Sequence, residues 1–219
     1  MKLPALTALA VATTGVLMLT SCTEHGPARP NRPAGDQNKK VSSTSYEVGG
    51  PASQLSVDTT AGDVHVTASD RSGIKVTEKI TYTGDKPRTS HTSHDGKVAL
   101  RDSDCRSGTC SVSYRIEAPS RLASRIASGG GDITGTALAG STVAKTNGGE
   151  VRLGFAHAPA DIDAFSGGGD VRLELPAGKY AVTARTNGGD RKVDVTTDAG
   201  SAHKVRARSN GGDVTIKQT

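Results

Sequence analysis

Six acidic residues that follow glycines are the first candidates for chemistry in this 219-residue sequence. They are Asp63, Asp132, Glu150, Asp170, Asp190 and Asp213. If the chain stacks them, a row of carboxylates could bind divalent cations or carbohydrate, and carboxylates roughly 5 to 9 Å apart could cleave glycosidic bonds. The alternative is structural, with each acid accepting hydrogen bonds from backbone amides of its own turn. We favour the structural interpretation because the acid always accompanies the glycines of the turn.

The acids mark a phrase that recurs along the chain. The copies read TTAGDVHV from Thr59, ASGGGDITG from Ala127, KTNGGEVRL from Lys145, FSGGGDVRL from Phe165, RTNGGDRKV from Arg185 and RSNGGDVTI from Arg208. From Asp132 onward the acids are 18, 20, 20 and 23 residues apart, and a period near twenty indicates a solenoid. Calcium-binding repeats have a nine-residue period, which this spacing does not match.

Alternation of apolar and polar residues within each repeat predicts two strands per coil, for example in Val171–Leu175 and Tyr180–Arg185. We expect the repeated glycines to supply positive φ at one corner of the coil, and Gly178 or Gly200 to do so at the opposite corner. The sequence therefore predicts an all-β fold, a β-solenoid with coils of about twenty residues that buries Val, Leu, Ile and Ala between stacked parallel sheets.

The N-terminal residues 1–21 predict a signal peptide, with Lys2 before an apolar stretch that is shorter than the roughly 20 residues of a spanning helix. A retained transmembrane helix is the alternative. The residues Leu19-Thr20-Ser21-Cys22 resemble the lipobox of bacterial lipoproteins. This resemblance implies cleavage before Cys22 and attachment of diacylglycerol to its sulfur. We therefore expect a protein anchored by lipid to the extracytoplasmic face of the cell membrane.

Residues 22–45 follow the leader and contain three prolines but no apolar periodicity, which indicates a disordered tether. Residues 46–219 are expected to form the folded domain. Loss of Lys2 with the leader changes the formal charge from +5 to +4, and the basic residues are scattered among few aromatics. This composition argues against nucleic-acid binding and fits attraction to anionic lipid or an acidic wall polymer.

The first repeat, at Asp63, precedes the second by 69 residues. Alternating segments in this interval predict an antiparallel hairpin insertion over residues 84–118, with residues 84–96 as an exposed loop. Cys105 and Cys110 lie within it, and an even pair in an exported chain predicts a disulfide at a hairpin tip. A redox-active or metal-binding pair is the alternative, although no second cysteine pair or local histidine supports it.

The repeated NGGDV-like and SGGGDV-like units of residues 45–219 resemble those of the bacterial putative-adhesin family, a domain of unknown function. The resemblance implies a β-solenoid that lies behind a leader or membrane anchor. One unit departs from the pattern, because Arg191 occupies the position that Val or Ile holds in the others. Either this coil slips so that Val193 and Val195 pack in the core, or Arg191 lies at an edge where its charge reaches water.

Other motifs for chemistry are weak. His91, His94 and Asp95 form the only local cluster that could begin a metal site, and it is incomplete, so we predict neither metal nor cofactor. No nucleophile elbow, zincin signature or phosphate-binding loop occurs. We predict a non-enzymatic surface domain for binding or adhesion, with an envelope polymer or surface protein as partner. The alternative is a polysaccharide-active enzyme on a β-helix scaffold.

Overall fold

The computed structural model describes residues 38–103, 105 and 110–219. These described residues form one compact unit. The expected signal peptide, Cys22 and the first part of the expected tether lie outside the described residues. The described residues form eighteen β-strands and no helix, which confirms the prediction of an all-β fold. Within these ranges, no helix that could span a membrane occurs.

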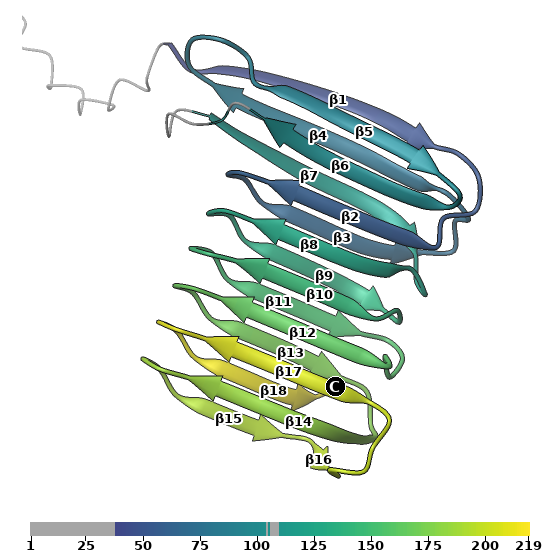
Figure 1. The fold of residues 1–219 in the computed structure, drawn as a ribbon, viewed down its shortest axis with the longest axis vertical. Helices are drawn as coiled ribbons and strands as arrows, with labels where there is room; N and C mark the ends of the chain where they lie inside the picture. Colours follow the sequence, from purple (N-terminus) through teal and green to yellow (C-terminus); the bar gives the residue numbers. More distant parts are fainter. Residues whose placement is uncertain (1–37, 104, 106–109) are drawn as a thin grey trace, which may run out of the picture. The chain divides into compact units, whose positions relative to one another are not determined.

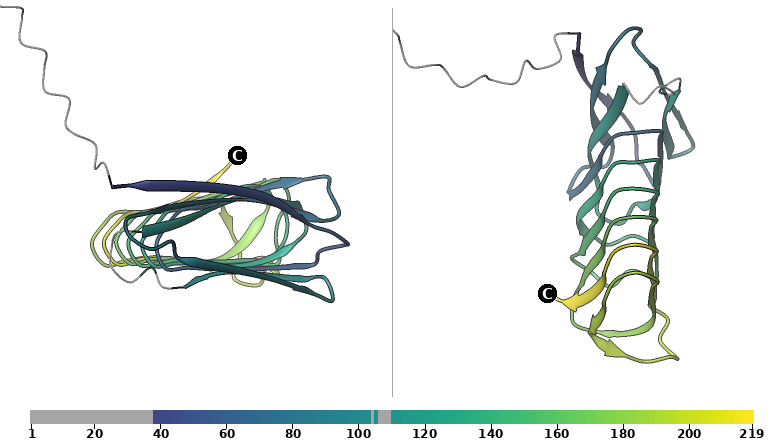
Figure 2. Two further views of the ribbon diagram at one scale, coloured as in Figure 1. Left: turned by 90° about the horizontal axis from the view of Figure 1, so that it is seen from above. Right: turned by 90° about the vertical axis from the view of Figure 1, so that its left-hand side faces the viewer.

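The strands form two nine-stranded sheets. The first sheet contains, in spatial order, β1 (Lys40–Val48), β4 (Ile74–Tyr82), β7 (Cys110–Pro119), β3 (Val64–Ser69), β9 (Ile133–Leu138), β11 (Val151–Phe155), β13 (Val171–Leu175), β18 (Val214–Gln218) and β15 (Arg191–Asp194). The second sheet contains β5 (Arg88–His94), β6 (Lys97–Ser103), β2 (Gln54–Thr59), β8 (Ala123–Ser128), β10 (Thr142–Thr146), β12 (Asp161–Ser166), β17 (Lys204–Ser209), β14 (Lys179–Thr186) and β16 (Thr196–Thr197). Figure 1 shows the strands stacked one above another, and Figure 2 shows that the two sheets face each other.

Each repeated phrase forms the turn that carries the chain from the second sheet to the first. We call the two strands joined by such a turn a rung. Neighbouring rungs pair in parallel and in register, so that Val151 lies between Ile133 and Val171. Strand alternation turns the apolar residues of both sheets inward, and Leu153 and Leu173 are buried between the sheets. The core is therefore a continuous aliphatic layer, as the sequence predicts.

The stack departs from chain order at its C-terminal end. The rung β17–β18 lies between the rung β12–β13 and the rung β14–β15, although it comes last in the sequence. The inserted rung buries Val205, Ala207, Val214 and Ile216. The displaced rung carries the exposed Arg191, which pairs in register with Val214. The less apolar rung therefore occupies the end of the stack, where a charge can reach water.

This arrangement resolves the two alternatives for Arg191. The coil does not slip, because Arg191 keeps the register of the valines and isoleucines in the other rungs. Its strand β15 is an edge strand, and the side chain is exposed. Val193 and Val195 are only partly buried against the core. The edge alternative is thus the one that the structure supports.

The N-terminal part of the stack has antiparallel strands. β4 pairs antiparallel with both β1 and β7, and β5 pairs antiparallel with β6. β7 also pairs in parallel with β3, and β3 pairs with β9. The first repeat therefore lies directly on the second, despite the long interval between them. Within residues 84–118, β5 and β6 join the second sheet, whereas β7 joins the first.

Two boundaries predicted from the sequence are wrong. The sequence pattern places residues 40–45 in the tether, but they belong to the edge strand β1, whose side chains are mostly exposed. Residues 84–96 were predicted as a loop, but Arg88–His94 form the edge strand β5. Edge strands bury little apolar surface, so the apolar periodicity that marks the other strands is weak in both segments.

The repeated glycines are required for a steric reason, and the prediction of positive φ is wrong for most of them. Among the described glycines of the repeated turns, only Gly62 has a left-handed φ, at 140°. A Cβ on Gly131 would lie 2.1 Å from the carbonyl oxygen of Gly62, and a Cβ on Gly169 would lie 2.5 Å from that of Gly149. Consecutive turns therefore stack backbone on backbone, and a side chain would separate them.

Candidate functional site

The six repeat acids lie in a row at the corner where the chain enters the first sheet. Each is the residue immediately before a strand of the first sheet. The register places Asp213 between Asp170 and Asp190, because the last rung is inserted. The expected row thus exists, although its order differs from the order in the sequence.

Four of the six acids accept a hydrogen bond from the neighbouring rung, which corrects the expectation that each would accept them from its own turn. Oδ1 of Asp132 accepts from the amide of Glu150 at 2.8 Å, and Oδ1 of Asp213 accepts from the amide of Asp190 at 2.8 Å. Equivalent bonds join Asp63 to the amide of Asp132 at 3.0 Å and Asp170 to the amide of Asp213 at 2.8 Å. The carboxylates therefore hold successive rungs together.

Arginines neutralise the middle of the row. Oδ2 of Asp170 contacts Nη2 of Arg172 at 2.7 Å. Glu150 forms ion pairs with both Arg152 and Arg172. These side chains are partly exposed, so each pair contributes little stability by itself. Within the described ranges, no three His, Cys, Asp or Glu side chains lie close enough together to hold a metal ion.

A second row, made of hydroxyls that are buried except in the end rung, provides the contacts expected of the acids; it was not predicted from the sequence. Its members lie four residues before the five acids from Asp132 onward and are Ser128, Thr146, Ser166, Thr186 and Ser209. Ser166 shows both contacts of the set. Its Oγ accepts from the amide of Gly169 at 2.8 Å and donates to the carbonyl of Gly149 in the preceding rung at 2.6 Å. The repeated Ser or Thr before the glycines was the available sequence signal.

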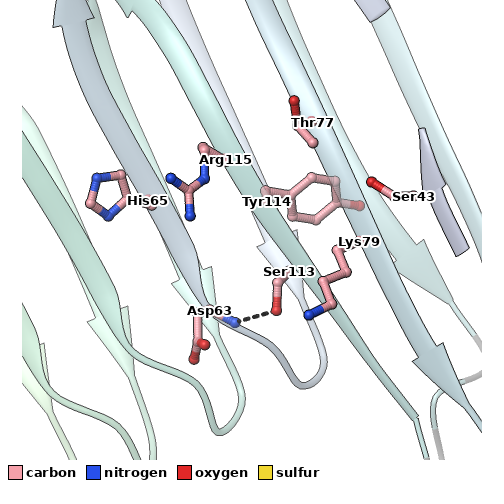
Figure 3. A pocket seen from close by; sticks show the side chains of 8 residues that line it. All are labelled: Ser43, Asp63, His65, Thr77, Lys79, Ser113, Tyr114 and Arg115. Carbon is pink, nitrogen blue, oxygen red and sulfur yellow. Dashed lines mark hydrogen bonds between the residues drawn. The ribbon is translucent and has the colours of Figure 1, made fainter. Parts of the chain in front are cut away.

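A shallow pocket of about 300 Å³ lies where the row of acids ends. Its lining residues come from β1, β3, β4 and β7 and are Ser43, Asp63, His65, Thr77, Lys79, Ser113, Tyr114 and Arg115. Figure 3 labels these side chains; Lys79, Ser113 and Arg115 face outward, whereas the ring of Tyr114 is buried on the other side of the sheet. The amide of Asp63 donates to Oγ of Ser113 at 3.1 Å. The pocket therefore combines cationic and hydroxyl groups with one carboxylate.

Polar groups also lie between the sheets near this pocket. Glu78 is 7% exposed and accepts a hydrogen bond from Oγ1 of Thr89 at 3.0 Å. Burial, and after it the charge of Glu78, raise the pKa of Tyr46 to about 12. Burial also raises the pKa of Tyr114 well above its usual range, with Glu78 and Asp102 contributing. Both phenols therefore stay protonated at neutral pH.

The remaining predicted groups do not converge into a site. Cys105 and Cys110 form a disulfide with 5.4 Å between their Cα atoms. His91 stacks on the ring of Tyr46 at 4.5 Å, whereas His94 contacts Asp95. The two histidines face opposite sides of β5, because His91 pairs with the buried Leu100 and His94 pairs with the exposed Lys97.

Comparisons with known proteins agree with this fold. Residues 107–217, just over half of the chain, match the family described as Toastrack DUF4097. The chain therefore belongs to this family. A crystal structure of a putative cell adhesion protein from Clostridium sporogenes is similar, with 15% identity and a TM-score of 0.60, covering 82% of this chain and all of that one. At this identity the similarity shows the fold alone.

Two further crystal structures are more distant. A putative adhesin from Bacteroides fragilis has 13% identity and a TM-score of 0.31, covering 82% of this chain and 97% of that one. A putative lipid binding protein from Parabacteroides distasonis has 11% identity and a TM-score of 0.28, covering 84% of this chain and 98% of that one. No curated protein matches the chain significantly.

Proposed function

We propose that this protein is a lipid-anchored, non-enzymatic domain that binds a repetitive partner at the cell surface. The observation that carries the proposal is the register of the parallel rungs. It places equivalent outward side chains, such as Arg152 and Arg172, on adjacent strands about 4.8 Å apart. A polymer with repeating groups can meet the same kind of side chain at successive strands. The adhesion role ascribed to the Clostridium protein is consistent with this proposal.

The architecture that we propose for this role is a β-solenoid with coils of about twenty residues over residues 46–219. The parallel pairing of β8 with β10 and of β10 with β12 supports it. The antiparallel strands β5 and β6 act as an insertion that extends the second sheet. Such a scaffold offers a broad surface whose ligand contacts can be spread over many strands.

The contacts of the repeat acids favour binding over the alternative of a polysaccharide-active enzyme. A glycosidase needs one carboxyl group that can donate a proton and a second that can attack or activate water. Here the carboxylates of Asp63, Asp132, Asp170 and Asp213 each accept a backbone hydrogen bond from the next rung. These acids therefore have a structural role that accounts for their repetition without catalysis.

An array of envelope polysaccharides and wall polymers tests the proposed function. The purified full chain is incubated with each polymer, and both retention of the protein and release of soluble products are measured. We expect saturable retention on at least one polymer without product release. Product release would support the enzyme instead, and the absence of retention on every polymer and on purified envelope proteins would contradict a binding role.

The proposed anchor depends on Cys22, whose sulfur would carry the lipid. Replacing Cys22 with Ala should abolish incorporation of radiolabelled palmitate and release the protein from the membrane fraction. The Ser21→Ala variant serves as the control, because alanine is also a small residue and the cysteine remains. Continued labelling of Cys22→Ala would show that the anchor is attached elsewhere or that the leader is retained as a membrane segment.

A further inference from the structure

The pocket in Figure 3 lies on the outward face of the first sheet, at the boundary between parallel and antiparallel strands. Across this face, Lys79 of β4 pairs with Ser43 on one side and with Ser113 on the other. At the next outward position of the same strands, two residues further along β7, Arg115 pairs with Thr77 and with His65. Directly opposed residues of neighbouring strands have Cβ atoms about 5 Å apart, so these side chains reach a common space.

The charges of this pocket differ from those of the rest of the face. On the interior strands of the first sheet the other outward Lys and Arg side chains have carboxylate partners, as Lys217 has in Glu174 and Lys75 has in Glu117. The row of acids ends at Asp63. Ser113 and Lys79 occupy the next two positions along the row. Among the described residues, neither Lys79 nor Arg115 has a carboxylate within ion-pairing distance.

The donors around the pocket are numerous and varied. Lys79 and Arg115 are exposed cations, and Ser43, Thr77 and Ser113 add hydroxyls. Tyr114 also lines the pocket, but its side chain is 2% exposed and faces the core, so its hydroxyl is not one of these donors. A phosphate group has several acceptor oxygens and accepts charge-assisted hydrogen bonds from both lysine and arginine.

We propose that this pocket binds a phosphate group carried by the surface polymer or lipid that the domain recognises. This inference rests on the proposed binding function and assigns it a ligand chemistry and a position. Lys79 and Arg115 neutralise the phosphate charge, and the hydroxyls orient its oxygens. Asp63 opposes binding through its charge and lies at one side of the pocket.

The test measures binding of the full chain to poly(glycerol phosphate), to phosphatidylglycerol vesicles and to phosphate-free controls of each. The variant Lys79→Gln/Arg115→Gln removes both cations of the pocket. The matched control Lys145→Gln/Arg208→Gln removes the same residue types from the second sheet, where both are already paired with Asp163. We expect the pocket variant to weaken binding roughly tenfold or more and the control to weaken it less than about threefold. If this difference is seen with poly(glycerol phosphate), the bound phosphate belongs to a polymer. If it is seen with the vesicles, the phosphate belongs to a lipid.

A third variant predicts a change of opposite sign. Asp63→Asn keeps an oxygen that can accept the amide of Asp132 while removing the only carboxylate among the described residues that line the pocket. It should tighten phosphate binding about threefold or more. Equal losses in both double variants, or no phosphate-dependent binding by the wild type, would overturn the site. If the polymer array still shows binding in that case, the proposed function survives and only the pocket assignment fails.

Discussion

The repeated rungs from Ala123 to Gln218 and the strands from Lys40 to Pro119 satisfy their polar groups in different ways. In the rungs, one arrangement of turn hydroxyl, glycine and acid is copied from turn to turn. In the described part of the earlier strands, two buried side-chain atoms lack partners, Nε of Arg71 and Oη of Tyr114. The repeated rungs thus satisfy their polar groups internally, whereas the earlier strands do not satisfy all of theirs. The groups of these strands that a ligand can reach are the exposed Lys79 and Arg115.

The largest test of the repeated region concerns the backbone contact between turns. In Gly169→Ala the new Cβ would meet the carbonyl oxygen of Gly149 at 2.5 Å, which forces the two rungs apart. We expect a loss of about 3 kcal/mol in the free energy of unfolding, measured by urea denaturation. Gly130→Ala is the matched control, because no atom lies within 4 Å of its Cβ. Similar losses in both variants would show that backbone freedom, not stacking, selects glycine.

The second test removes one member of the hydroxyl row. Ser166→Ala leaves the amide of Gly169 and the carbonyl of Gly149 without their side-chain partner at a fully buried position. We expect a loss of about 2 kcal/mol, since an unsatisfied buried group costs more than a hydrogen bond gains. Ser56→Ala on the outward face of β2 should cost less than about 0.5 kcal/mol. A loss as small in Ser166→Ala would mean that water replaces the hydroxyl.

The sequence predicted the repeated region well because its pattern acts locally. Alternation within Val171–Leu175 specifies a half-buried strand, and recurrence of the glycine turn specifies stacking. The partner of each acid could not be read in the same way. Asp170 bonds to the amide of Asp213, which lies far away in the chain, and only the three-dimensional order of rungs brings them together.

The spatial order of the rungs is the main feature that could not be predicted from the sequence. Residues 204–218 carry the same alternation as the other rungs, so the pattern alone places them last. The structure places them one rung earlier, because Val214 and Ile216 fill an interior position better than Arg191 does. The pocket was also missed, because Lys79, Arg115 and Ser43 come from three strands that only antiparallel pairing brings together.

The third test separates structural from ion-binding roles in the acid row. Asp170→Ala removes the acceptor for the amide of Asp213 and should cost about 1 kcal/mol, whereas Asp170→Asn should retain most of that hydrogen bond. Melting curves of both variants and the wild type are compared with calcium and with chelator. We expect no calcium dependence. Calcium at a hundred times its dissociation constant would add about 2.7 kcal/mol to a genuine site, which would shift the wild type by several degrees.

The smallest effect at neutral pH is expected in the irregular strands, at Tyr46. The pKa of this phenol is about 12 in the folded protein, above the ordinary value of 10.0, because burial and the charge of Glu78 disfavour the phenolate. Above pH 10 the unfolded chain therefore releases this proton while the folded chain retains it, so the free energy of unfolding falls as pH rises toward 12. Tyr46→Phe removes this dependence and keeps a ring to stack on His91.

Urea denaturation at pH 8, 10 and 11 measures the difference between wild type and Tyr46→Phe at each pH, so that titration of lysines and of Tyr114 cancels in the comparison. The two proteins should have nearly equal stability at pH 8, and the variant should become progressively more stable than the wild type above pH 10. A constant difference at all three values would show that the Tyr46 hydroxyl reaches water. In that case the inner polar groups of the irregular strands would be hydrated, and the contrast with the closed hydroxyl row of the rungs would be sharper.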